Sequence, residues 1–258
     1  MKNLCNSRYE GLTVLVTGGG AGLGEAICER LAAEGAAVAV LDYSIEAAQR
    51  VASKLREQGA KALALCADVT RPEQLKQAIA TLLEEFGQLD MVVNNAGIGI
   101  PFAPLADQED ETWARVIDVN LTGVFNSMKA ELPHMQERGG AIINIASVTA
   151  LMGIAGVSPY VAAKHGVLGL TRSAAIEYGK YGVRVNAVCP TFVRTALTMA
   201  ELTDEELMVV LPPVGKLPTK ECIDGYSQQG CHCHWRYWQH RSGCVSGTRC
   251  SRYAGSGR

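Results

Sequence analysis

The strongest constraint on the fold is an alternation of short apolar runs with longer helical patterns through residues 12–190. The runs expected to be strands cover residues 12–16, 37–41, 62–66, 91–93, 141–145 and 183–188. Helical patterns separate them, for example over residues 45–58 and 72–86. The strand candidates read as apolar runs rather than as alternations of apolar and polar residues, as in parallel strands that are buried on both faces. The sequence therefore predicts an α/β fold, a single doubly wound domain with a parallel sheet between two layers of helices.

Composition excludes several classes of protein. The chain has 258 residues, of which 48% are hydrophobic and 19% charged, so it can bury a core and is not intrinsically disordered. A net charge of −2 provides no basic excess for binding a nucleic-acid backbone. No apolar run approaches the ~20 residues that a membrane helix requires, and residues 1–10 lack the pattern of a signal peptide. We therefore expect a cytoplasmic protein without nucleic-acid or membrane partners.

A glycine-rich loop with the pattern T-G-x-x-x-G-x-G follows the first expected strand. Gly18, Gly22 and Gly24 permit a tight turn, a close approach of the backbone to a pyrophosphate, and close packing of the next helix. The start of that helix would direct free N–H groups and its positive dipole end toward the phosphates. Such loops also occur without a ligand, but the position of this one in a strand–helix–strand unit favours dinucleotide binding.

A carboxylate at the end of the second expected strand strengthens this interpretation. Asp42 stands where a side chain would accept hydrogen bonds from both hydroxyls of the adenosine ribose. A turn cap is the alternative role for such a residue. The carboxylate would also repel a 2′-phosphate, and no arginine stands in the loop or beside Asp42 in the sequence. The sequence therefore predicts NAD rather than NADP.

Several further motifs occur in an order and spacing typical of one family. They are the loop 17–24, Asp68-Val69, Asn94-Asn95-Ala96-Gly97, Asn120, Ser147, Tyr160-x-x-x-Lys164 and Pro190-x-x-Val193-x-Thr195. With these motifs the chain resembles the classical short-chain dehydrogenases and reductases over about residues 10–220. The resemblance implies a Rossmann-type domain and an NAD-dependent oxidoreductase that interconverts a secondary alcohol and a ketone by hydride transfer.

The resemblance also implies roles for four catalytic residues. Tyr160 would be the general acid/base, Ser147 would hydrogen-bond the substrate oxygen, and Asn120 would order a water chain to Lys164. Lys164 would lower the pKa of Tyr160 and hold the nicotinamide ribose. We expect Ser158 to cap a helix that has Tyr160 in its first turn, so that the helix dipole, the Lys164 ammonium and the oxidised nicotinamide all favour the phenolate.

The remaining expected contacts are to the cofactor, and no metal site is expected. The residues implied to bind NAD are Gly18, Gly22, Leu23, Gly24, Asp42, Asp68, Val69, Asn95, Gly97, Tyr160, Lys164, Pro190, Val193 and Thr195. The family usually has glycine after the proline, whereas this chain has Thr191. A threonine would strain a conformation that depends on glycine, so the local cofactor contacts differ from the family pattern.

The expected substrate is a small hydrophobic or cyclic secondary alcohol, or its ketone. In the family, the segment between the serine and the tyrosine lines part of the substrate pocket, and residues 148–157 are largely apolar here. Residues 195–215 would form a substrate lid, and a homodimer or homotetramer is expected. Two alternatives are an NADP-dependent 3-oxoacyl reductase, which shares the catalytic motifs, and a catalytically impaired nucleotide-binding protein with an abnormal C-terminus.

The composition changes near residue 221, which divides the chain into a Rossmann-type domain, 1–221, and an atypical tail, 222–258. The tail is rich in cysteine, histidine and arginine, and it lacks the C-terminal helix and last strand that the family usually has. We expect the tail to be poorly ordered. Its Cys-His-Cys-His run (residues 231–234) has no usual zinc-site spacing, so a shifted reading frame explains the composition better than a metal site.

Overall fold

The computed structural model describes residues 8–191, and in that range six parallel strands form one sheet. The strands are β1 (Thr13–Thr17), β2 (Ala37–Asp42), β3 (Ala62–Cys66), β4 (Met91–Asn94), β5 (Gly140–Ile145) and β6 (Val183–Val188). Their order across the sheet is β3-β2-β1-β4-β5-β6. This is the strand order of a Rossmann-type fold, so the predicted fold class is confirmed for the described residues.

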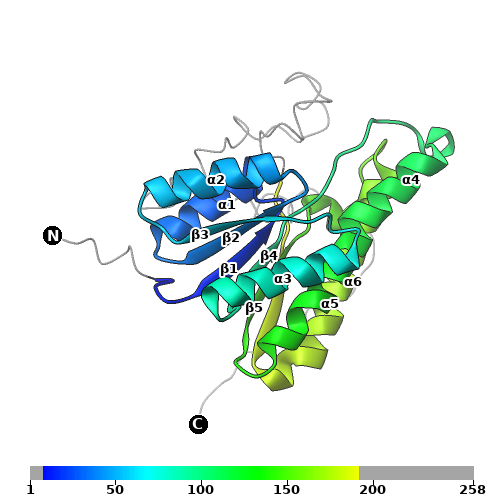
Figure 1. The fold of residues 1–258 in the computed structure, drawn as a ribbon. Helices are drawn as coiled ribbons and strands as arrows, with labels where there is room; N and C mark the ends of the chain where they lie inside the picture. Colours follow the sequence, from blue (N-terminus) through cyan, green and yellow to red (C-terminus); the bar gives the residue numbers. More distant parts are fainter. Residues whose placement is uncertain (1–7, 192–258) are drawn as a thin grey trace, which may run out of the picture. The chain divides into compact units, whose positions relative to one another are not determined.

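Helices cover both faces of the sheet (Figure 1). They are α1 (Gly22–Ala33), α2 (Ile45–Glu57), α3 (Pro72–Phe86), α4 (Asp110–Ile117), α5 (Gly123–Met135) and α6 (Ser158–Tyr178). In Figure 1, α1 and α2 lie on one side of the strands, and α3 and α5 lie on the other. This is the doubly wound arrangement that the alternating pattern predicts.

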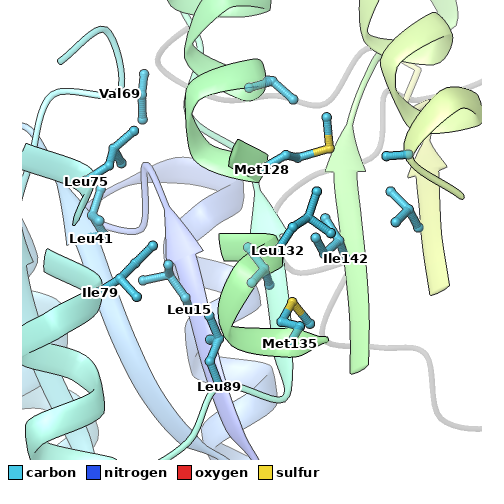
Figure 2. Packing of buried hydrophobic residues seen from close by; sticks show 14 of the residues in the cluster. Leu15, Leu41, Val69, Leu75, Ile79, Leu89, Met128, Leu132, Met135 and Ile142 are labelled. Carbon is cyan, nitrogen blue, oxygen red and sulfur yellow. The ribbon is translucent and has the colours of Figure 1, made fainter. Parts of the chain in front are cut away.

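The side chains of β1 show how the sequence builds two cores. Val14 and Val16 pack in one buried cluster with Leu55 of α2. Leu15 points to the opposite face because successive side chains of a strand alternate, and it packs in a second cluster with Ile79 and Leu132. Figure 2 shows this second cluster, to which α3, α5 and β5 also contribute labelled side chains. A strand buried on both faces therefore requires apolar side chains on both, as β1 has between its terminal threonines.

Two local features concern the helices: one interrupts the segment from α4 to α5, and the other shifts the start of α6 by one residue from the expected cap. Residues Asp118–Thr122 form a π-helical turn between α4 and α5. Ser158 is the first residue of α6 rather than its cap, and Val157 occupies the cap position without a side-chain hydrogen bond. The expected Ser158 cap was therefore wrong by one residue. Tyr160 still lies in the first turn of α6, directly after Pro159, whose fixed φ suits that position.

Several expectations fall outside residues 8–191. These are the cofactor contacts of Val193 and Thr195, the substrate lid over residues 195–215, the domain boundary near residue 221 and the atypical tail. Among the described residues, no helix is both long and apolar enough to cross a membrane.

Candidate active site

The site lies where the strand order reverses, between the carboxyl ends of β1 and β4. Thr17 ends β1, and its Oγ1 accepts hydrogen bonds from the N–H groups of Asn95 at 3.0 Å and Ala96 at 3.1 Å. Asn95 Nδ2 donates in return to the carbonyl oxygens of Thr17 and Gly18, each at 3.1 Å. Asn95 therefore joins the loop after β4 to the glycine-rich loop after β1, at the position where Rossmann-type sheets bind their ligands.

The glycine-rich loop has the backbone conformation that the motif requires. Gly18 has a φ of 61°, which L-residues rarely adopt, and a Cβ there would lie 2.9 Å from Ala96 Cα. A Cβ on Gly24 would lie 2.0 Å from the Gly18 carbonyl oxygen. Gly22 and Leu23 begin α1, and Ala21 at its cap position makes no side-chain hydrogen bond. The first N–H groups of α1 are thus not capped by the Ala21 side chain, which suits the binding of a phosphate.

Asp42 ends β2 next to this loop and is 7% exposed. Its Oδ2 accepts a hydrogen bond from the Gly20 N–H at 2.9 Å, and its Oδ1 accepts one from the Ser44 N–H at 3.1 Å. The carboxylate therefore has the turn-capping role that was the alternative in the sequence. Each of its oxygens has further lone pairs, so the ribose-binding role stays compatible with this geometry.

An arginine that is distant in the sequence contacts the glycine-rich loop near Asp42. Arg50 of α2 donates through Nη2 to the Gly20 carbonyl oxygen at 2.6 Å. Gly20 is also the residue whose N–H donates to Asp42. The sequence does not reveal this, because residue 50 is close to the loop only once α2 has packed beside α1. The guanidinium is also paired with the Glu25 carboxylate through two hydrogen bonds of 3.0 Å. Its positive charge is thus offset by a neighbouring carboxylate.

The two residues expected near the adenine make hydrogen bonds within the protein. Asp68 Oδ1 accepts hydrogen bonds from the N–H of Thr70 at 2.9 Å and from its Oγ1 at 2.8 Å. Val69 is buried, and its carbonyl oxygen accepts a hydrogen bond from Asn126 Nδ2 at 3.1 Å. Both residues follow β3 at the same edge of the sheet as Asp42. Their contacts to an adenine remain a prediction.

The structure brings Ser147, Tyr160 and Lys164 together beyond the end of β5. Lys164 is buried, and its Nζ donates to the Ile145 carbonyl oxygen at 2.9 Å and lies 5.5 Å from the centroid of the Tyr160 ring. Ser147 is hydrogen-bonded to Tyr160. Ser147 Oγ also accepts a hydrogen bond from the Thr149 N–H at 3.2 Å, in the short 3₁₀ turn Val148–Ala150. The end of β5 and the segment after it thus lie against α6, and together they hold the Ser147 hydroxyl, the Tyr160 phenol and the Lys164 ammonium in one cluster.

Burial dominates the ionisation of this cluster. It raises the pKa of Tyr160 above its usual value, and the hydrogen bond with Ser147 opposes the rise only in part. Burial also lowers the pKa of Lys164 to about 8. The expectation of a lowered Tyr160 pKa was therefore wrong for the protein alone, because desolvation of the phenolate outweighs the hydrogen bond with Ser147. The remaining positive group named in that expectation is the oxidised nicotinamide, which this structure does not contain.

Asn120 lies in the π-helical turn and is fully buried. Its Oδ1 accepts a hydrogen bond from the Ile98 N–H at 3.1 Å, and its Nδ2 donates to the Ile98 carbonyl oxygen at 3.0 Å. Gly97 fits between this asparagine and the lysine, since a Cβ there would lie 2.6 Å from Asn120 Oδ1 and 3.8 Å from Lys164 Nζ. Gly97, Asn120 and Lys164 therefore lie close together. Whether Asn120 orders water remains a prediction.

Pro190 closes the described part of the site. Its carbonyl oxygen accepts a hydrogen bond from the Val148 N–H at 2.8 Å, and the Val188 carbonyl oxygen accepts one from the Ala146 N–H at 2.8 Å. These bonds continue the pairing of β5 and β6 past Ser147. They place Pro190 next to the segment that carries Ser147.

A cluster of buried polar side chains beneath the site was not expected from the sequence. Asn94 Nδ2 donates to Glu131 Oε2 at 3.1 Å and to Asn144 Oδ1 at 3.0 Å. Asn144 Nδ2 donates in turn to Thr171 Oγ1 at 3.0 Å. These side chains come from β4, α5, β5 and α6. The available signal was a polar residue inside two otherwise apolar strands, since a buried amide requires hydrogen-bond partners.

The arrangement can bind a dinucleotide and move a proton. The crowded glycine loop, the helix start and Asp42 fit a cofactor with a pyrophosphate and a ribose. The phenol of Tyr160, with a hydroxyl and an ammonium beside it, fits a group that exchanges a proton with a substrate oxygen.

Comparisons with known proteins agree with this geometry. The model of the family described as "short chain dehydrogenase" matches residues 12–206. The chain is 42% identical over 222 residues to cyclohexanol dehydrogenase of Acinetobacter sp. (strain SE19), covering 86% of this chain and 88% of the relative. It is 42% identical over 209 residues to cis-4-hydroxycyclohexanecarboxylate dehydrogenase of Sinomonas cyclohexanicum, covering 80% and 84%. The solved structure of NAD⁺-bound xylitol dehydrogenase is 35% identical, with a TM-score of 0.71 over 73% of each chain. The chain therefore belongs to the short-chain dehydrogenase family of oxidoreductases.

Proposed function

We propose that this protein is an NAD-dependent dehydrogenase that interconverts a hydrophobic, cyclic secondary alcohol and its ketone. The observation that carries the reaction type is the cluster of Ser147, Tyr160 and Lys164, with Lys164 Nζ 5.5 Å from the Tyr160 ring. The cofactor, when bound, accepts or supplies the hydride. Tyr160 takes the hydroxyl proton of the alcohol during oxidation and returns it to the oxygen during reduction, while Ser147 holds that oxygen by a hydrogen bond.

The proposed substrate class rests on the surroundings of Tyr160 and on the relatives. Tyr160 packs against a small apolar cluster that includes Ile98, Ile154 and Val157. Such surroundings favour an uncharged ring over a charged or extended polar substrate. Two relatives that share 42% identity with this chain are named as dehydrogenases of cyclohexane-derived alcohols.

The proposed preference for NAD rests on Asp42. A carboxylate beside the adenosine ribose accepts hydrogen bonds from a 2′-hydroxyl and repels a 2′-phosphate. The nearby Arg50 does not cancel this repulsion, because Glu25 already pairs with its guanidinium.

The test is a set of cyclic and acyclic secondary alcohols, assayed with NAD and with NADP by the absorbance of the reduced cofactor. We expect turnover of cyclohexanol-type alcohols with NAD and much weaker binding of NADP in parallel calorimetric titrations. Asp42→Ala should weaken NAD binding and narrow the difference between the two cofactors. Equal affinities of the wild-type protein for NAD and NADP would contradict the cofactor assignment. NAD binding without turnover of any alcohol or ketone would instead support a catalytically impaired nucleotide-binding protein.

A further inference from the structure

The glycine-rich loop is held from two sides at one residue. The Gly20 N–H donates to Asp42 Oδ2 at 2.9 Å, and the Gly20 carbonyl oxygen accepts from Arg50 Nη2 at 2.6 Å. The two peptide groups that flank Gly20 are therefore each oriented by a side chain. Because a peptide group is planar and trans, fixing the Gly20 carbonyl also fixes the direction of the Ala21 N–H, immediately before α1.

Arg50 is itself fixed before it reaches the loop. Its Nη1 and Nη2 donate to Glu25 Oε1 and Oε2, each at 3.0 Å. A planar guanidinium that makes two parallel hydrogen bonds to a carboxylate has a defined orientation. The Glu25 side chain is only 11% exposed, and Glu25 lies in the first turn of α1. The arginine thus links the loop, the beginning of α1 and α2.

A second ion pair between the same helices offers a comparison. Lys54 Nζ lies 2.6 Å from Glu29 Oε1, so it too joins α2 to α1. Lys54 and Glu29 each stand four residues further along their helices than Arg50 and Glu25, about one turn away from the loop. The two pairs share their helices and their kind of interaction, but of these two cations it is Arg50 that also makes a hydrogen bond with the backbone of the loop, while Lys54 bonds Glu29.

We propose that Arg50 is a positioning residue for the cofactor, which sets the affinity for NAD by holding the Gly20 carbonyl and so the loop 18–21. This inference rests on the proposed NAD-dependent function. Arg50 acts on the loop and not on the reacting atoms, so its removal weakens binding of the ADP half of the cofactor and leaves the chemical step unchanged. Glu25 orients Arg50 for this role and prevents it from offering its charge to a 2′-phosphate.

The test compares Arg50→Gln with the matched control Lys54→Gln, using NAD and ADP titrations, steady-state kinetics and thermal unfolding. Loss of a charged hydrogen bond to the loop should raise the Kd of both NAD and ADP by about tenfold. The KM for NAD should rise by the same factor, with kcat at saturating NAD nearly unchanged. Lys54→Gln should leave these constants close to those of the wild type. Arg50→Lys, which keeps the charge but loses the planar double contact, should give an intermediate Kd.

Two results would overturn the role of Arg50. One is wild-type affinity of Arg50→Gln for both NAD and ADP. The other is an equal loss of affinity in Arg50→Gln and Lys54→Gln, which would mean that any loosening of α1 against α2 affects the site. If Arg50→Gln does not fold, Arg50→Lys decides the question by the same comparison. A wild-type protein that binds neither NAD nor NADP would overturn the proposed function itself, and this inference with it.

Discussion

Tyr160 illustrates how burial and chemistry oppose each other at a single residue. The phenol packs against an apolar cluster, so water stabilises its anion poorly and its pKa rises. The hydrogen bond with Ser147 lowers this pKa in part. Lys164 is affected in the opposite direction, since burial lowers its pKa to about 8. Both shifts reduce charge in the protein alone. A proton acceptor at this position therefore needs added positive charge, which the proposed oxidised cofactor would bring.

Replacing Tyr160 by phenylalanine tests the proposed acid/base role most directly. Tyr160→Phe removes one hydroxyl and little binding area, so we expect kcat to fall by roughly 10²- to 10⁴-fold with the Kd for NAD nearly unchanged. Initial rates on an alcohol that the wild type oxidises and a parallel NAD titration measure the two effects. Tyr9→Phe, a change of the same size outside the site, is the control. If Tyr160→Phe retained near wild-type kcat, another group would have to carry the proton.

At the scale of elements, the π-helical turn has the largest effect on the site. It interrupts the segment from α4 to α5 and places Asn120, fully buried, against the backbone of Ile98. The loop after β4 passes so close to Asn120 that Gly97 has no room for a side chain. The π-helical turn, the loop after β4 and α6 thus pack closely around Lys164.

This crowding predicts opposite results for two glycine substitutions. Gly97→Ala places a Cβ 2.6 Å from Asn120 Oδ1, so we expect a loss of about 1–3 kcal/mol in the free energy of unfolding and reduced turnover. Gly169→Ala, on α6, meets no atom within 4 Å and should raise that free energy by up to about 1 kcal/mol, because alanine favours the helix. Chemical denaturation and initial rates measure both variants. A Gly97→Ala protein as stable and active as the wild type would show that the loop moves aside at little cost.

The elements differ in how well the sequence predicts them. The ends of all six described strands lie within one residue of their expected positions, because each strand is a short, mainly apolar segment. The last strand, β6, differs in alternating buried and exposed residues over Val183–Asn186. Ser147, Tyr160 and Lys164 were expected from the family resemblance, and the structure brings their side chains together. The π-helical turn was not predictable, because the pattern over residues 110–135 is also compatible with a regular helix. The bonds that hold the Asn120 side chain of this turn join it to Ile98, 22 positions away. Arg50 escaped prediction for the same reason, since it reaches Gly20 across 30 positions.

At the scale of the whole molecule, a cluster of buried polar side chains connects the centre of the sheet to the helices on one face. Asn94, Asn144, Glu131 and Thr171 form a chain of hydrogen bonds through β4, β5, α5 and α6. Within the described residues, Glu131 Oε1 and Asn94 Oδ1 have no hydrogen-bond partner. Burial raises the pKa of Glu131 to about 8. Burial therefore favours the neutral form of its carboxyl in the folded protein.

This raised pKa predicts a pH dependence of stability. Because folding favours protonated Glu131, its stabilising contribution is complete below its ordinary pKa of 4.5 and is lost as the pH rises through about 8. Glu131→Gln stays neutral at every pH, so its stability relative to the wild type should improve steadily between these values. Denaturation at several pH values measures the difference, with the exposed Glu85→Gln as the control. A relative stability of Glu131→Gln that does not change with pH would contradict the assignment of a neutral carboxyl.

The pairing of β1 with β4 also determines when the site can form during folding. The glycine loop, α1, β2 and α2 follow one another directly along the chain, and such local contacts form early. The bonds between Thr17 and Asn95 join residues 78 positions apart, and Lys164 must arrive later still from α6. Because closing a longer chain segment costs more entropy, the adenosine half of the site should assemble before the catalytic half. A newly synthesised chain would then be able to hold a nucleotide before it is able to use one.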